Sequence, residues 1–127
     1  MKRPEQELQI QVAAFMDRIP GLLFWHTPNG GGRSKVEASI LKAMGVKPGV
    51  PDLIVLLPNG KVGFIELKAG KGVASPAQRQ MMGELRARGC PCVEARSLEQ
   101  VAETLNGWLS PFGYRVPRVT TPRAEAA

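Results

Sequence analysis

The sequence has few of the residues that build disulfide frameworks, zinc sites or membrane spans. Its 127 residues include two cysteines and one histidine, His26. Cys90 and Cys92 are one residue apart, so they cannot form a useful disulfide framework, and a zinc site would lack partners. No apolar run approaches the roughly 20 residues of a membrane-spanning helix, and the start turns polar where a signal peptide would be apolar. We therefore expect a cytoplasmic protein with reduced thiols and no membrane partner.

The sequence also has fewer acidic than basic residues. There are 11 Asp and Glu against 17 Lys and Arg, which gives a net charge of +6 and a pI near 9.8. A basic balance of this size favours a polyanionic partner such as nucleic acid. With 43% hydrophobic residues, the chain can build one domain with a core. Residues 110–127 are rich in Pro, Thr, Ala and Arg, so we expect a domain over 1–109 and a flexible basic tail over 110–127.

Apolar periodicity and turn residues predict four helices and four strands. An apolar stripe at helical spacing, from Leu8 to Ile19, predicts the first helix. Capping patterns that start at Ser34 and Ser75 begin two more helices. The expected helices span about 5–18, 34–44, 76–88 and 98–109, and the expected strands span 22–26, 53–57, 62–68 and 91–96. This order, α-β-α-β-β-α-β-α, predicts an α/β domain with one mixed sheet flanked by helices.

Three charged residues fall at one end of the predicted hairpin. Asn59-Gly60 is the strongest short signal for a hairpin turn. Folding the chain about a centre between these two residues brings Asp52 opposite the Glu66–Lys68 end, with an error of about one residue. Glu66 and Lys68 share one strand face. Two carboxylates build a poor core, but they suit a divalent cation such as Mg²⁺. A neighbouring lysine can orient or deprotonate water, or offset charge on a phosphate.

Pro51-Asp52 followed by Glu66-Leu67-Lys68 belongs to a longer series of segments. The others are Glu7-Leu8-Gln9-Ile10-Gln11, Pro28-Asn29-Gly30-Gly31, Gly45-Val46-Lys47-Pro48-Gly49-Val50 and Ser75-Pro76-Ala77-Gln78. In this order and spacing, over about residues 5–85, the chain resembles the virus-type replication-repair nuclease (VRR-NUC) family of the PD-(D/E)xK nucleases. The resemblance implies a restriction-endonuclease-like α/β core, with one extra helix over 34–44. It also implies metal-dependent hydrolysis of phosphodiester bonds.

The resemblance implies a role for each position of the hairpin motif. Asp52 and Glu66 would be ligands of Mg²⁺ or Mn²⁺, and the backbone carbonyl of Leu67 would be a further ligand. Lys68 would be the catalytic lysine. Water would attack the phosphorus in line while the ion stabilises charge on the phosphate.

Three further positions carry competing interpretations. The first helix would supply a metal-binding acid, and we prefer Glu7 because the glutamine four residues later leads directly into an apolar run. Glu5 has the same spacing to a glutamine and stays an alternative. Gln78 would be the catalytic glutamine after the hairpin, although Ser75-x-x-Gln78 is itself a capping box and can be purely structural. His26 can be a general base, or simply a packed or surface residue.

DNA contacts are expected on two loops. The glycine-rich loop before the second helix can bind phosphate through backbone N–H groups and through Asn29, Arg33 and Lys35. It lacks the ending of a Walker A loop. The basic loop after the hairpin adds Lys71 and, at its end, Ser75. Ordinary solvent-exposed loops are the plain alternative.

Together these features predict a Mg²⁺- or Mn²⁺-dependent deoxyribonuclease that selects branched or junction DNA in replication, repair or recombination. A homodimer is expected, since one small domain offers little surface for a branched duplex and related resolvase-like enzymes act as two-fold dimers. A bacterial or phage-infected cell suits a domain of this kind. Two alternatives stay open: a catalytically silent nucleic-acid-binding module with the nuclease fold, and a metal-free adaptor that docks an acidic protein.

Overall fold

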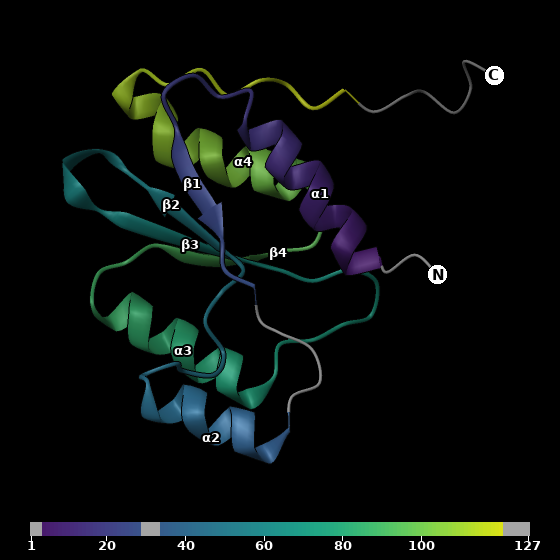
Figure 1. Ribbon diagram of the computed structural model, residues 1–127. Helices are drawn as coiled ribbons and strands as arrows, with labels where there is room; N and C mark the ends of the chain where they lie inside the picture. Colours follow the sequence, from purple (N-terminus) through teal and green to yellow (C-terminus); the bar gives the residue numbers. More distant parts are fainter. Residues whose placement is uncertain (1–3, 29–33, 121–127) are drawn as a thin grey trace.

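The computed structural model describes residues 4–28 and 34–120. Within them, the elements follow the predicted order, with two short 3-10 turns added (Figure 1). The helices are α1 (Pro4–Met16), α2 (Lys35–Ala43), α3 (Pro76–Ala87) and α4 (Leu98–Leu109), and the strands are β1 (Leu23–His26), β2 (Leu53–Leu56), β3 (Val62–Leu67) and β4 (Cys92–Ala95). The sheet order is β1-β2-β3-β4, with β3 and β4 parallel and the other pairs antiparallel. The predicted mixed α/β sheet is confirmed.

The hydrophobic core lies between the sheet and the two helices α1 and α4, which cover the same face (Figure 1). Alternate residues of β2 and β3 point into it, and Leu53, Val55, Ile65 and Leu67 are at most 1% exposed. The predicted apolar stripe of α1 packs against them. Each side chain of this size stabilises the fold by about 1.5–3 kcal/mol when it is fully buried. This packing fixes the two strands whose ends carry the predicted site.

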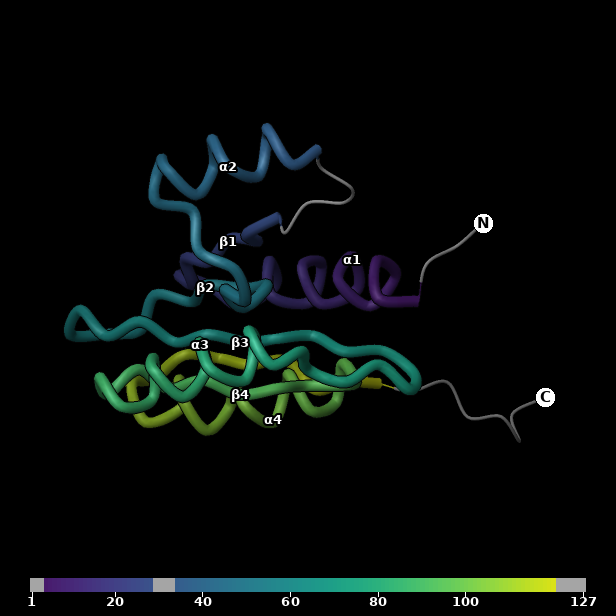
Figure 2. Tube along the Cα trace, turned by 90° about the horizontal axis from the view of Figure 1, so that it is seen from below, coloured from purple at the N-terminus to yellow at the C-terminus, as the bar shows by residue number. Residues whose placement is uncertain are grey.

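On the opposite face α3 covers the sheet, whereas α2 stands away from it (Figures 1 and 2). Ser34 and Ser75 cap these two helices as predicted, and each hydroxyl accepts a hydrogen bond from the backbone N–H three residues later. Figure 2 shows α2 beyond β1, at the end of the sheet away from β4. Although α2 is amphipathic, none of its residues is buried. Across residues 4–28 and 34–120, no helix is long and apolar enough to cross a membrane.

The hairpin turn differs from the expected two-residue form. Leu53 pairs with Ile65, so the hairpin is centred on Asn59 rather than between Asn59 and Gly60. Both central residues have positive φ, 66° for Asn59 and 74° for Gly60, but Pro58 joins them in a three-residue 3-10 turn. Because proline has no N–H to donate, the strand ladder closes on the residues outside it. The shift lies within the expected error, and the charged end of the hairpin stays together.

Part of the expected tail packs on the core. Ser110–Phe112 form a 3-10 turn, and Tyr114, Val116 and Val119 are partly buried against the core. The composition of this segment suggested mobility, but these three apolar side chains find a surface beside α4. Residues 121–127 lie outside the described residues, so a flexible tail there and a domain boundary at 109 stay predictions.

Candidate active site

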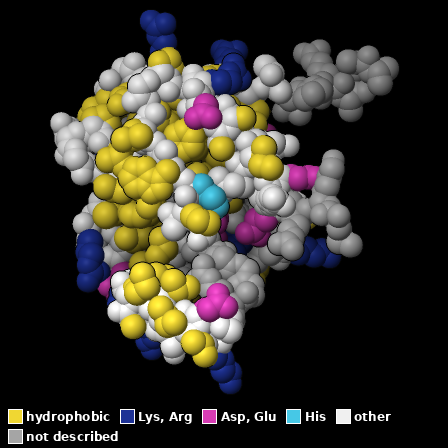
Figure 3. Space-filling model, viewed as in Figure 1, with side chains coloured by type: hydrophobic (Ala, Val, Ile, Leu, Met, Phe, Trp, Pro, Cys, Tyr) yellow, Lys and Arg dark blue, Asp and Glu magenta, His cyan; other side chains and the backbone are white. Residues whose placement is uncertain are grey.

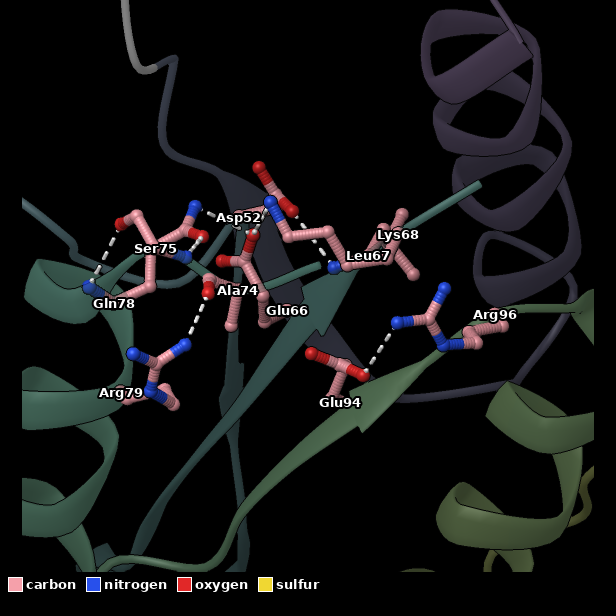
Figure 4. A network of polar contacts seen from close by, with 10 residues as sticks. All are labelled: Asp52, Glu66, Leu67, Lys68, Ala74, Ser75, Gln78, Arg79, Glu94 and Arg96. Carbon is pink, nitrogen blue, oxygen red and sulfur yellow. Dashed lines mark hydrogen bonds and ion pairs between the residues drawn. The ribbon is translucent and has the colours of Figure 1, made fainter. Parts of the chain in front are cut away.

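Hydrogen bonds from two neighbouring strands hold Asp52 at the start of β2. Its carboxylate Oδ2 accepts a hydrogen bond from the backbone N–H of Leu67 at 2.7 Å (Figure 4). Its backbone carbonyl accepts from the N–H of Thr27 at 2.7 Å and from Nδ1 of His26 at 2.9 Å. The end of β3 and the end of β1 therefore fix both the side chain and the backbone of this aspartate.

Glu66 is the most deeply buried charged residue of the site, with 1% of its surface exposed. Its Oε2 accepts a hydrogen bond from Nε2 of Gln78 at 2.9 Å and lies 3.4 Å from Nζ of Lys68. Its Oε1 is buried and has no hydrogen-bond partner among the described residues. A buried carboxylate normally has partners for both oxygens, because losing water without replacement costs free energy. This oxygen is therefore a candidate donor to a bound cation.

The pKa of Glu66 rises from its ordinary value of 4.5 to about 7. Burial is the largest cause, the negative charge of Asp52 adds to it, and the ammonium of Lys68 opposes it. The two carboxylates thus repel each other, and Glu66 itself is buried away from water. A divalent cation between them would remove this repulsion and favour the ionised form of Glu66.

Lys68 follows β3 directly and continues its pairing, since its N–H donates to the backbone carbonyl of Ala95 at 3.0 Å. Its side chain is 10% exposed and bends back toward the carboxylates of Asp52 and Glu66 (Figure 4). Glu66 and Lys68 therefore share a strand face, as predicted, while Leu67 between them points into the core. This alternation places the charged pair in the site and the leucine in the fold.

Gln78 forms the predicted capping box and also contacts the site, while its catalytic role stays a prediction. Its Oε1 accepts from the N–H of Ser75 at 2.9 Å, and its own N–H donates to the Ser75 hydroxyl at 3.1 Å, which completes the capping box. Its Nε2 donates to Glu66. The capping bonds orient the amide so that its donor end faces the site. The first turn of α3 thus positions the buried carboxylate.

A cleft of about 680 Å³ opens above these residues. The described residues that line it are Glu5, Gln6, Gln9, Ile10, His26, Pro28, Asp52, Glu66, Leu67 and Gln78. Both acids of α1 are exposed, but only Glu5 is part of this lining. Residues two apart on a helix face nearly opposite directions, while residues four apart share a face. Glu5 therefore shares the cleft face with Gln9.

The side chain of Glu5 also lies near that of Lys68. A β-carbon placed on Gly72 would lie 3.8 Å from Oε2 of Glu5 and 3.8 Å from Cδ of Lys68, so both side chains border the same glycine. The structure therefore favours Glu5 over the preferred Glu7 as the acid that α1 brings to the site. The metal-binding role of either residue stays a prediction.

Gln9 and His26 are the site residues that sequence reasoning did not assign. Nε2 of Gln9 is buried and has no hydrogen-bond partner among the described residues. Among these residues, Oε1 of Glu66 is the one further buried side-chain N or O atom without a partner. The available signal was the spacing of four residues between Glu5 and Gln9. His26 lines the cleft and holds the backbone of Asp52, which is a positioning contact that a lone histidine in a strand does not reveal in advance.

The predicted DNA contacts are only partly placed. Asn29 and Arg33 lie outside the described residues. Lys35 begins α2, Lys71 lies in the loop after β3, and Ser75 caps α3, and all three are exposed. Their contacts with DNA stay predictions.

The donors present suit a hard divalent cation. No three or more His, Cys, Asp and Glu side chains of the described residues gather closely enough to hold a metal ion alone. Asp52 and Glu66 supply two carboxylates, and the carbonyl of Leu67 faces the Asp52 side, because the N–H and C=O of one strand residue point the same way. Mg²⁺ typically binds one or two carboxylates, keeps several waters and takes other ligands from substrate phosphate. The unsatisfied oxygen of Glu66 completes this fit.

Comparison with known proteins gives a consistent match. Residues 4–99 match the family model of the VRR-NUC domain. A solved structure described as a VRR_NUC domain protein is 26% identical, with a TM-score of 0.70, over 87% of this chain and 91% of that one. Another, described as a VRR_NUC domain, is 25% identical, with a TM-score of 0.57, over 85% of this chain and 99% of that one. A search of curated proteins found no match.

Proposed function

This chain belongs to the VRR-NUC family, a family of the nuclease type, and from that premise we propose that its cleft hydrolyses phosphodiester bonds in DNA with the help of Mg²⁺ or Mn²⁺. The observation that carries the proposal is the buried Glu66, held beside Asp52 and Lys68 at the bottom of a cleft. Burying Glu66 and Lys68 beside a second acid costs stability, and such a cost is typical of a catalytic site.

Each residue then has a chemical task. Asp52 and Glu66 would hold the ion, together with the Leu67 carbonyl and the acid that α1 contributes. When bound, the ion would polarise the phosphate and lower the pKa of a water molecule. Lys68, as an ammonium group, can donate to a phosphate oxygen and offset the negative charge that develops in the transition state. Gln78 keeps Glu66 in place through its hydrogen bond.

The alternative from another class is a nucleic-acid-binding module that has lost catalysis. Such a module would have no use for the buried Glu66, whose ionisation the surroundings oppose. In the absence of selection for chemistry, replacing the acids by apolar residues would stabilise the fold. The presence of Asp52, Glu66 and Lys68 together therefore favours the enzyme.

A cleavage assay tests the proposal. The purified protein is incubated with single-stranded, duplex, flapped and four-way-junction DNA, and with RNA, in Mg²⁺ or Mn²⁺. We expect cleavage of DNA, greatest on a branched form, and its loss in Lys68→Ala. Lys61→Ala, at the exposed far end of the hairpin, is the matched control and should cleave as wild type does. Cleavage that survives Lys68→Ala would contradict the assigned site, and binding of every DNA without cleavage would favour the silent module.

We also propose that the protein acts as a homodimer through the outer face of α2. Val36, Ile40 and Met44 are 68%, 54% and 74% exposed. They are four residues apart and form one apolar stripe, and Figure 3 shows apolar side chains gathered over this helix. The stripe is symmetric about Ile40, so two antiparallel copies of α2 would place Val36 against Met44 of the second copy. A two-fold interface requires this self-complementarity.

Light scattering tests the dimer. We expect twice the monomer mass for the wild type and the monomer mass for Ile40→Glu, with unchanged circular dichroism. Phe112→Glu is the control, because Phe112 is a similarly exposed apolar side chain that does not line the cleft. A monomeric wild type, with and without DNA, would remove this part of the proposal.

A further inference from the structure

A second and larger groove adjoins the catalytic cleft. It has a volume of about 990 Å³ and runs between α2, the segment 45–50 and the first turn of α3. Pro28 and Gln78 line both the groove and the cleft, so the two hollows meet. Because Gln78 also binds Glu66, a strand lying across this junction would pass the buried carboxylate.

The two hollows differ in charge. Three acids, Glu5, Asp52 and Glu66, line the cleft. The described lining of the groove contains no acid and has two lysines, Lys42 and Lys47. The phosphate to be cut would lie in the acidic cleft, beside the bound cation. The neighbouring phosphates of the same strand would then lie in the basic groove, near its lysines.

The floor of the groove is aliphatic. Leu41, Val46, Pro48 and Val50 line it beside the lysines, and Val46 is 46% exposed. Aliphatic side chains gain from contact with the faces and edges of bases and with sugars. Base faces are accessible only where a strand is not stacked in a duplex.

We infer that this groove binds the unpaired nucleotides of the DNA strand next to the phosphate that is cut, with Lys42 and Lys47 contacting phosphates and the aliphatic floor contacting bases. The inference rests on the proposed nuclease function and narrows its substrate to a strand with an unpaired flank, as in a flap or splayed arm. Lys42 also suits the C-terminus of α2 for electrostatic reasons, so the test must measure phosphate contact itself.

Fluorescence anisotropy provides that test. All variants carry Asp52→Asn, and flapped DNA and a perfect duplex of equal length are titrated without metal at several salt concentrations. For Lys42→Ala/Lys47→Ala we expect about tenfold weaker binding of flapped DNA and a salt slope smaller by about 1.4, since each contact to a single-stranded phosphate contributes about 0.7. Lys61→Ala/Arg115→Ala removes the same charge from exposed positions elsewhere and should leave both values unchanged.

A third variant separates base contact from phosphate contact. Val46→Ser should weaken the binding of flapped DNA without changing the salt slope, and it should leave duplex binding as it was. Equal losses for duplex and flapped DNA in the lysine variant, or the same loss in the control, would overturn the inference.

A cleavage assay on the protein with Asp52 intact distinguishes the groove inference from the nuclease proposal. If it cuts flapped DNA, and adding Lys42→Ala/Lys47→Ala changes neither binding nor cutting, the groove inference fails and the nuclease stands. If it cuts no DNA, but the lysine variant still loses flapped DNA selectively, the nuclease fails and the groove stands as a nucleic-acid site.

Discussion

Glu66→Gln should change the dependence of stability on pH. Folding raises the pKa of Glu66 from 4.5 to about 7, mainly by burial. Between these values the folded state holds a proton that the unfolded state has released, so the free energy of unfolding falls as pH rises. This loss begins near the unfolded pKa, is complete above the folded pKa, and is absent when a neutral glutamine replaces the carboxyl group.

The size of the effect follows from the two pKa values. Each tenfold change in proton affinity corresponds to about 1.4 kcal/mol, so the rise from 4.5 to about 7 amounts to about 3 kcal/mol. The difference in unfolding free energy, Glu66→Gln minus wild type, should therefore increase by about 3 kcal/mol between pH 4 and pH 8. The hydrogen bond from Gln78 can be retained, because the new amide oxygen also accepts.

Urea unfolding followed by circular dichroism, at half-unit steps from pH 4 to pH 8.5, measures this difference. Glu103→Gln, at an exposed position of α4, is the matched control and should show a flat difference. At pH 8, Mn²⁺ should stabilise the wild type more than it stabilises Glu66→Gln. Parallel pH profiles for wild type and Glu66→Gln would show that Glu66 is not buried against a second negative charge, and would refute the reasoning.

Three further experiments test the residues around the site. Glu5→Gln should lower single-turnover cleavage at least about tenfold, and Glu7→Gln should leave it near wild type; equal losses would contradict the assignment to Glu5. Gly49 and Gly45 both have positive φ, but only at Gly49 would a β-carbon meet the backbone of α3, at 2.4 Å. In urea unfolding, Gly45→Ala should therefore cost about 1–2 kcal/mol and Gly49→Ala clearly more. Gln78→Glu keeps a capping box but loses the donor to the buried carboxylate, so cleavage should fall while helix content by circular dichroism stays.

The hairpin could be predicted because local chemistry determines it. Asn59-Gly60 fixes the turn to within one residue, and strand alternation then places Glu66 and Lys68 on one face. The remaining error came from Pro58, which enlarged the turn. A register error of this size does not separate Asp52 from the end of β3, so the predicted proximity of Asp52, Glu66 and Lys68 was still correct.

The contribution of α1 was harder to predict because it depends on the rotation of a helix against the sheet. Glu5 and Glu7 have the same spacing to a glutamine, and only packing shows that Glu5 faces the cleft. Val116 and Val119 were likewise overlooked, since the surface that receives them forms only when the chain folds. The burial of Glu66 also depends on neighbours from α3, which composition and periodicity do not reveal.

The central claim is that Asp52 and Glu66 together hold the ion on which cleavage depends. Isothermal calorimetry with Mn²⁺, on wild type and Glu66→Gln at pH 6 and pH 8, tests it directly. We predict binding to the wild type, with release of a proton at pH 6 because the raised pKa keeps Glu66 largely protonated there. Proton release should vanish at pH 8, and Glu66→Gln should bind at least about tenfold more weakly. Equal binding by both proteins, with no proton release, would contradict the account.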